Sequence, residues 1–276
     1  MANILSALTT ESYSQLQVVK TPSEAPGHYD YIVCAHKAID QETVAKQFSP
    51  VVDEKGTTFV LIQNGVGNEE PFRKIFPGST IISCVTWVGG VQNTPGIVNH
   101  TKNENTQLGL YPNPGLDTDL EKRRLDIFAS LLREGGTKLT VESNIQVQRW
   151  EKVVWNCAWN SLTTLTMLDT QSWLNSSPEA MIMTRRLMRE VIDVGRKCGV
   201  PLEFELVDIL MDRILAMPGI RSSMQEDCAN GRPMEVDMIM GTPVRKAREL
   251  KMDTPTLETI YAILLGVDFR LRNARL

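Results

Sequence analysis

The chain has 276 residues, of which 42% are hydrophobic and 22% charged, and its formal net charge is -4. These are the proportions of a folded protein with enough apolar residues for one large or two medium domains. No run of basic residues suggests binding to nucleic acid or to a membrane surface. Small molecules and other proteins are therefore the expected partners.

The five cysteines are widely spaced, and the chain has only three histidines. This pattern fits neither a structural zinc site nor a disulfide framework, so we predict no bound metal. The N-terminus lacks a basic and then apolar leader, and no stretch reaches the ~18 apolar residues of a membrane span. We expect a cytoplasmic protein in a reducing compartment.

In the first half, short apolar stretches alternate with amphipathic ones. The predicted strands are Leu16–Val19, Tyr31–Ala35, Thr58–Asn64 and Thr80–Trp87. The stretches IDQETVAKQF and GNEEPFRKIF between them predict helices. Apolar strands that alternate with helices are typical of a parallel sheet covered on both faces.

After Trp87 the pattern changes. GGVQNTPG predicts a loop, IVNHT and TQLGLY predict a hairpin around Lys102–Asn105, and a helix (Leu120–Arg133) leads to the strand TKLTV. The helices predicted beyond this point are Val147–Leu165, Pro178–Cys198, Glu203–Met217, Met234–Leu250 and Leu257–Leu265. We therefore predict an α/β plus all-α fold. It has a truncated Rossmann-type parallel sheet domain (residues 1–143) followed by a helical C-terminal domain (residues 144–276) for substrate binding and dimerisation.

A polar stripe marks the segment RWEKVVWNCAWNSLTTL. Lys152, Asn156 and Asn160 are four residues apart and share one face of the predicted helix. Most other positions are apolar, which indicates a buried helix whose polar face lines a cleft. A lysine there would lose solvation and become a proton donor near neutral pH. The alternative, a solvated face of a surface helix, is equally compatible with the periodicity.

A second group of polar residues lies in SSMQEDCANGRPMEVDMIMG. Pro233 is predicted to open a helix after the Asn230-Gly231 turn, which places Glu235 in its first turn. The helix dipole stabilises a carboxylate there, so Glu235 is a candidate acceptor for a substrate hydroxyl. Ser223 could donate to a substrate carboxylate. An ordinary acidic helix N-terminus is the alternative.

Two further residues follow predicted strands. Asn64 ends the strand at LIQNG, and Lys37 comes just after YIVCA. Ligands of open α/β sheets bind beyond the carboxyl ends of strands, which makes both residues candidates for a ligand site. An everyday Asn-Gly turn is the alternative for Asn64.

Together these segments resemble the ketopantoate reductase (2-dehydropantoate 2-reductase) family. The matching pieces are YDYIVCAHKA, VLIQNGVGNEE, CVTWVGGVQNTPGIVNH, WEKVVWNCAWNSLT and SSMQEDCANGRPMEVDMIMG, in the family's order from about Asp30 to Tyr261. The resemblance implies an NADP-dependent, homodimeric oxidoreductase of pantothenate biosynthesis that reduces a 2-keto acid.

The resemblance also assigns roles to residues. Lys152 matches the catalytic lysine that protonates the carbonyl oxygen, and Glu235 matches the acidic residue that orients the substrate hydroxyl. The matching substrate-binding positions are Ser223, Asn156 and Asn160. The positions matching those near the NADP phosphates and nicotinamide ribose are Lys37 and Asn64.

The sequence departs from the family in two places. The family's GxGxxG loop, which holds the cofactor pyrophosphate, does not occur. We therefore expect a chain that lacks the first βαβ unit, or, as an alternative, a non-catalytic remnant for dimerisation or partner binding. Beyond Asn160 the family's further substrate asparagine is replaced by TMLDTQSW, so a substrate other than ketopantoate stays open.

Overall fold

The structure, a computed structural model, describes residues 3–5, 17–53, 55–101 and 105–273. The chain divides into two compact units. Unit 1 comprises Met1–Ala35, Asp40–Ile62 and Glu69–Ile145, and unit 2 comprises His36–Ile39, Gln63–Asn68 and Gln146–Leu276. Two short loops from the first half of the sequence therefore belong to unit 2.

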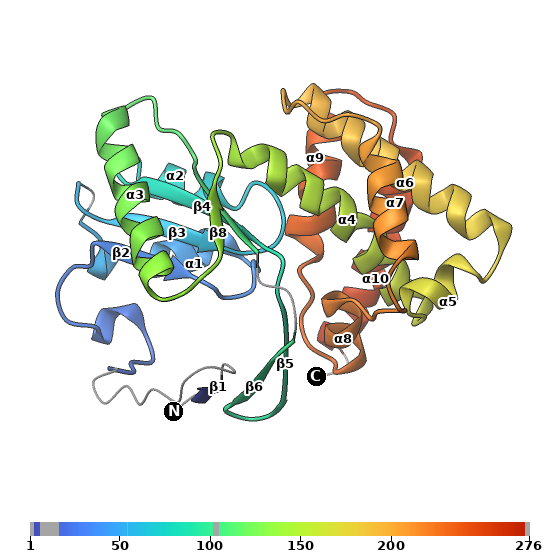
Figure 1. Ribbon diagram of the computed structural model, residues 1–276, viewed down its shortest axis with the longest axis horizontal. Helices are drawn as coiled ribbons and strands as arrows, with labels where there is room; N and C mark the ends of the chain where they lie inside the picture. The colour runs from blue at the N-terminus through green and yellow to red at the C-terminus, as the bar shows by residue number, and fades with distance from the viewer. Residues whose placement is uncertain (1–2, 6–16, 54, 102–104, 274–276) are drawn as a thin grey trace. The chain divides into compact units, whose positions relative to one another are not determined.

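Unit 1 contains strands and three α-helices (Figure 1). The strands are β1 (Asn3–Leu5), β2 (Tyr31–Cys34), β3 (Thr58–Ile62), β4 (Thr80–Thr86), β5 (Gly89–Thr94), β6 (Ile97–Thr101), β7 (Thr106–Leu110) and β8 (Leu139–Val141). The helices are α1 (Gln41–Gln47), α2 (Glu69–Ile75) and α3 (Thr118–Glu134), with 3-10 turns at Pro22–Glu24 and Ser49–Val51.

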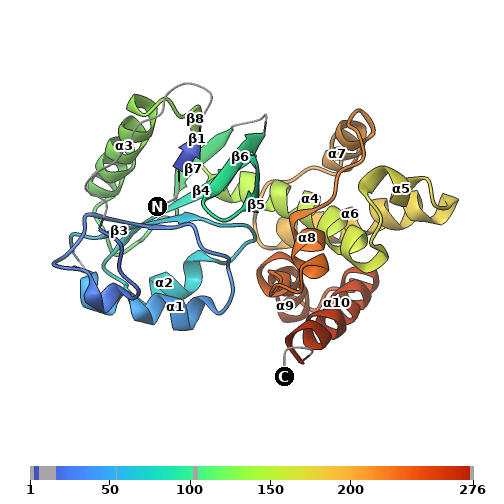
Figure 2. The same cartoon turned by 90° about the horizontal axis from the view of Figure 1, so that it is seen from below.

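The main sheet has the strand order β2-β3-β4-β7-β8. β2, β3 and β4 are parallel, β7 is antiparallel to β4, and β8 is parallel to β7. β1, β6 and β5 form a small second sheet, seen from below in Figure 2. The predicted parallel α/β sheet is confirmed for its first three strands.

Helices cover both faces of the main sheet. Alternate side chains of β3 point to opposite faces: Phe59 and Leu61 pack with Phe72 of α2, whereas Val60 packs with Phe128 of α3. α1 and α2 therefore share one face and α3 covers the other (Figure 1). A strand that is buried on both sides needs apolar residues at every position, which explains the unbroken TFVLI sequence.

Three sequence predictions in unit 1 are wrong, the first being the loop at GGVQNTPG, where β5 (Gly89–Thr94) forms. Residues 17–19 form no strand, and Leu16 lies outside the described residues. The hairpin joins β5 to β6 rather than β6 to β7, because Gly96 adopts a φ of +82° that permits a tight turn after Pro95. β7 instead pairs with β4, where Leu108 is fully buried in the core.

Unit 2 is helical. Its helices are α4 (Ile145–Thr166), α5 (Thr170–Leu174), α6 (Pro178–Lys197), α7 (Leu206–Leu215), α8 (Ser223–Ala229), a π-helix (Asp237–Gly241), α9 (Thr242–Glu249) and α10 (Pro255–Asn273). None of the described helices is long and apolar enough to cross a membrane. The helical C-terminal region is confirmed, although sequence analysis missed the short helices α5 and α8.

α6 illustrates how the sequence sets these helices. Ser177 accepts a hydrogen bond from the Ala180 amide, and Pro178 occupies the first turn, where no backbone donor is needed. Buried residues then recur every three or four positions, so one face packs inward. Gly199 follows the helix with a φ of +85°.

Candidate active site

Lys152 and Glu235 lie near each other in unit 2. Lys152 is a partly buried residue of α4, and Glu235, which is 9% exposed, directly precedes the helical turn that begins at Val236. Burial lowers the pKa of Lys152 from 10.5 to about 8; the nearby Arg149 lowers it as well, and the Glu235 carboxylate opposes both. The amine can therefore gain and lose a proton near neutral pH.

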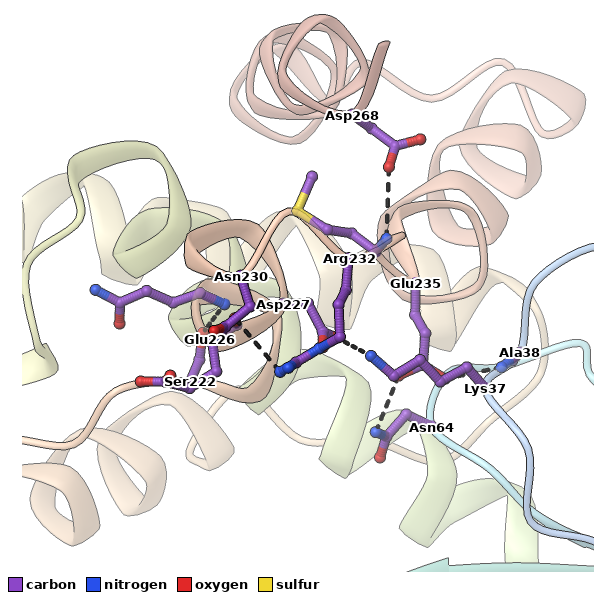
Figure 3. A network of polar contacts seen from close by, with 12 residues as sticks. Lys37, Ala38, Asn64, Ser222, Glu226, Asp227, Asn230, Arg232, Glu235 and Asp268 are labelled. Atoms are coloured by element: carbon purple, nitrogen blue, oxygen red, sulfur yellow. Dashed lines mark hydrogen bonds and ion pairs between the residues drawn. The ribbon is translucent and has the colours of Figure 1, made fainter. Parts of the chain in front are cut away.

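Two loops hold the Glu235 carboxylate. The backbone amide of Ala38 donates to Oε1 at 2.9 Å, and Nδ2 of Asn64 approaches Oε2 at 3.4 Å. Figure 3 shows both groups directed at the carboxylate. The Ala38 amide therefore fixes Oε1, whereas Oε2, with the longer contact, can still accept a further hydrogen bond.

The predicted position of Glu235 within a helix is wrong. Residues 232–235 are irregular, and a π-helix follows at Asp237–Gly241. Cys157 of α4 donates its thiol proton to the Ile239 carbonyl at 3.1 Å, and the Val66 amide donates to the Met238 carbonyl at 3.2 Å. Such outside donors satisfy carbonyls in the wide π turn, and π segments are frequent at functional sites.

Lys37 joins a different carboxylate. Its amine pairs with Asp227 of α8, whose other oxygen accepts from Nε of Arg232 at 2.9 Å. Figure 3 shows this network beside Asn64 and Glu235. The Asp227 side chain is 8% exposed, whereas that of Lys37 is 44% exposed. One buried carboxylate therefore holds two half-exposed cations.

The two asparagines of α4 are buried. Asn156 is 6% exposed and Asn160 5%, so the polar stripe does not face bulk solvent. Within the described residues, Nδ2 of Asn156 has no hydrogen-bond acceptor. A buried donor without a partner costs free energy unless a ligand supplies the acceptor.

Ser223 is placed apart from these contacts. It is an exposed residue at the start of α8, one turn before Asp227. The neighbouring Ser222 is the helix cap: its Oγ accepts from the Gln225 amide at 3.1 Å and is 2.7 Å from Oγ1 of Thr163. The structure thus brings together Lys152, Glu235 and Asn64, whereas none of the hydrogen bonds or ion pairs found among the described residues joins Ser223 to them.

Sequence reasoning missed three residues of this site. They are Arg149, which is 1% exposed, Asp227 and Arg232. Arg149 stands one helical turn before Lys152, and this spacing is the signal that could have drawn attention to it. Its burial was hidden because charged residues at a helix start usually face water.

The residues around Glu235 include several hydrogen-bond donors. The amide of Asn64 and the amine of Lys37 can donate to hydroxyl or anionic oxygens of a ligand. Nδ2 of Asn156 is a further donor whose acceptor is not found among the described residues. In the part of the chain that is described, no group of three His, Cys, Asp or Glu side chains is placed to hold a metal ion.

Comparison with known proteins identifies relatives along most of the chain. Sequence models of the families "Ketopantoate reductase PanE/ApbA" and "Ketopantoate reductase PanE/ApbA C terminal" match residues 4–113 and 144–268. A 2-dehydropantoate 2-reductase of Nostoc sp. is 27% identical over 247 residues, which cover 90% of this chain and 76% of the relative.

Solved structures agree with these matches. The 2-dehydropantoate 2-reductase of Methylococcus capsulatus is 28% identical, with a TM-score of 0.79 over 92% of this chain and 79% of that one. A dimeric ketopantoate reductase of Staphylococcus aureus is 25% identical, with a TM-score of 0.76 over 91% and 81%.

The Rossmann-like α/β unit, the helical unit and these relatives place the chain in the oxidoreductases of the dehydrogenase type. Within that class, the chain belongs to the ketopantoate reductase family.

Proposed function

We propose that this protein reduces a 2-keto acid, ketopantoate or a close relative of it, with NADPH as the hydride donor. The observation that carries the proposal is the partly buried amine of Lys152, which lies near the carboxylate of Glu235 and has a pKa of about 8. The names of the relatives, 2-dehydropantoate 2-reductases, supply the substrate class.

In this proposal Lys152 is the general acid. Negative charge develops on the carbonyl oxygen of a 2-keto acid as its carbon becomes tetrahedral. The Lys152 ammonium stabilises that charge and transfers one proton to the oxygen, giving the 2-hydroxy acid. A pKa near 8 favours this role, because the amine is protonated at neutral pH yet releases its proton more readily than an exposed lysine.

Glu235 orients the substrate in this scheme. Its Oε1 is engaged by the Ala38 amide, whereas its Oε2 has only the long contact with Asn64. The free lone pairs of Oε2 are available to accept from a substrate hydroxyl, such as the primary hydroxyl of ketopantoate. We assign Asn156, Asn160 and Ser223 to substrate binding, with the unpaired Nδ2 of Asn156 as the best supported of the three.

NADPH, when bound, would supply the hydride. Lys37 and Asn64 are the residues we assign to it, Lys37 for a phosphate and Asn64 for the nicotinamide ribose. The pairing of Lys37 with Asp227 supports this assignment, because it holds a cationic side chain close to Asn64.

The test is NADPH oxidation with ketopantoate, followed by absorbance. We expect turnover by the unaltered protein and a loss of roughly 10²- to 10⁴-fold in kcat for Lys152→Ala, with unchanged circular dichroism. The exposed Lys197 at the end of α6 provides the matched control, since Lys197→Ala should keep full activity. Unchanged turnover in Lys152→Ala would remove this lysine from the mechanism.

Two alternatives are separated by the same assay. Turnover of other 2-oxo acids but not of ketopantoate would change the substrate and keep the enzyme. Absence of turnover with every 2-oxo acid tried would favour a non-catalytic protein.

We also propose a cytoplasmic homodimer. The five cysteines are widely spaced in the sequence, which is typical of a protein from a reducing compartment rather than of a disulfide framework. A relative from Staphylococcus aureus is dimeric, and α10 exposes the apolar side chains of Ile263, Leu265 and Phe269. Cell fractionation and light scattering test this; a monomer at micromolar concentration would contradict it.

A further inference from the structure

Arg149 is a nearly inaccessible guanidinium that neither the sequence nor the proposed mechanism accounts for. It is 1% exposed and lies on α4, one turn before Lys152. A buried arginine is expensive unless its donors meet acceptors, so its contacts indicate what it is for.

Two of the hydrogen bonds of Arg149 reach the residues on either side of Asn64. Nη1 of Arg149 donates to the Gln63 carbonyl at 3.1 Å and to the Gly65 carbonyl at 3.0 Å, the residues immediately before and after Asn64. The side chain of Asn64 points to Oε2 of Glu235. The guanidinium therefore holds the backbone on both sides of the amide that contacts the carboxylate.

Other bonds show how this loop is built. Nε2 of Gln63 donates to the His36 carbonyl at 3.1 Å, and Nδ2 of Asn68 donates to the Asn64 carbonyl at 2.8 Å. The Val66 amide donates to Met238 of the π-helix. The two bonds of Arg149 connect α4, the helix of Lys152, to this loop.

We propose that Arg149 is a positioning residue of the active site, which clamps the Gln63–Gly65 loop to α4 and thereby fixes Asn64 and Glu235 relative to Lys152. It acts through the loop and through its positive charge.

The positive charge of Arg149 also affects the pKa of Lys152. Arg149 lowers the pKa of Lys152, as burial does, while Glu235 raises it. Burial and the arginine one turn away therefore both favour release of the proton from Lys152, against the effect of its carboxylate neighbour. This part of the inference rests on the proposed function, in which Lys152 donates the proton.

The experiment uses the whole protein without cofactor or substrate, so it does not depend on turnover. The pH dependence of Lys152 acetylation by acetic anhydride, read by mass spectrometry, reports the titration of the amine. Amide hydrogen exchange of a peptide covering residues 63–68 reports the clamp. The variants are Arg149→Met, Arg149→Gln and Arg149→Lys.

We expect Arg149→Gln to raise the titration midpoint of Lys152 above that of the unaltered protein, because the neighbouring positive charge is lost. Arg149→Lys keeps the charge and should leave the midpoint within a few tenths of a pH unit. Both Arg149→Met and Arg149→Gln should speed exchange in residues 63–68 at least several-fold. If Arg149→Met does not fold, the Gln and Lys variants, which keep a donor, carry the comparison.

Arg73 in unit 1 provides a matched control. Its guanidinium donates to the Ser79 and Tyr111 carbonyls at 2.8 and 2.9 Å, the same kind of clamp on a different loop. Arg73→Gln should lower stability and leave both readouts unchanged.

Equal Lys152 midpoints in the unaltered protein, Arg149→Gln and Arg149→Lys, or unaltered exchange in residues 63–68, would overturn the proposal. A different outcome would separate this proposal from the proposed function. If the Arg149 variants change the Lys152 midpoint and the exchange of residues 63–68 as expected, but the unaltered protein turns over no 2-oxo acid, the proposed function is contradicted and the positioning role of Arg149 is retained.

Discussion

At position 152 a charged amine is held where water solvates it poorly, and this has a thermodynamic cost. The lowering of its pKa from 10.5 to about 8 corresponds to at most about 3–4 kcal/mol of unfavourable free energy for the charged form. Below pH 8 the amine is protonated in both the folded and unfolded states, so the whole cost is present at pH 7.

The sign of the pH dependence follows. Between pH 8 and 10.5 the unfolded chain binds more protons than the folded one, so the free energy of unfolding rises with pH. We predict that Lys152→Met is more stable than the unaltered protein at pH 7 and that the difference shrinks towards pH 10.5. Urea unfolding at pH 7 and pH 10 measures it.

The exposed Lys197 again serves as the control, since Lys197→Met should show no such dependence. Glu235 keeps its bonds from Ala38 and Asn64 in the Lys152→Met variant, which limits the cost of leaving it without the amine. A Lys152→Met variant that is less stable by the same amount at both pH values would show that the amine is not desolvated.

At the scale of elements, the loop between β3 and α2 depends on a glycine at which a side chain would cause strain. Gly65 has a φ of +94°, and a Cβ there would lie 2.5 Å from the Met238 carbonyl oxygen. We predict that Gly65→Ala loses about 3 kcal/mol of stability, from backbone strain together with overpacking. Thermal unfolding measures the loss.

Gly199, after α6, separates the two causes. It has a similar φ of +85°, but no atom lies within 4 Å of the position of its Cβ. Gly199→Ala should therefore cost only the strain of about 1–2 kcal/mol. Equal losses in the two variants would mean that the Met238 contact does not constrain the loop.

The periodicity of the sequence predicted those elements whose own residues determine them. β2, β3 and β4 are apolar on both faces, and α4 and α6 carry 3.6-residue patterns, so each was found to within a few residues. The partner of β6 was not predictable, because strand pairing depends on which turn forms and on which strand buries Leu108. The π-helix was missed because its carbonyls are satisfied by distant residues such as Cys157.

The site was predictable to the same extent. Helical spacing placed Lys152, Asn156 and Asn160 on one face, and strand ends pointed to Asn64 and Lys37. Contacts across the chain, such as Arg149 with the Asn64 loop or Asp227 with Lys37, join residues with no regular spacing. Periodicity contains no information about such pairs.

At the scale of the whole molecule, the contacts described at the site all join residues of unit 2, including the loops His36–Ile39 and Gln63–Asn68. These loops directly follow β2 and β3 of unit 1 in the sequence. They contain Lys37 and Asn64, the residues we assign to the cofactor. Cofactor binding is therefore a property to measure on the intact chain, not on the helical region alone.

A ligand that binds only the folded state stabilises it, by about 2.7 kcal/mol when its concentration is 100 times Kd. We predict that NADPH raises the Tm of the intact chain by several degrees, and that NADH at the same concentration raises it less, because it lacks the 2′-phosphate. Asn64→Ala should reduce the shift, whereas Asn175→Ala, at an exposed asparagine after α5, should not. Equal shifts with both dinucleotides would contradict the NADP preference. No shift with either, up to millimolar concentration, would favour a non-catalytic protein, since a reductase cannot turn over a hydride donor that it does not bind.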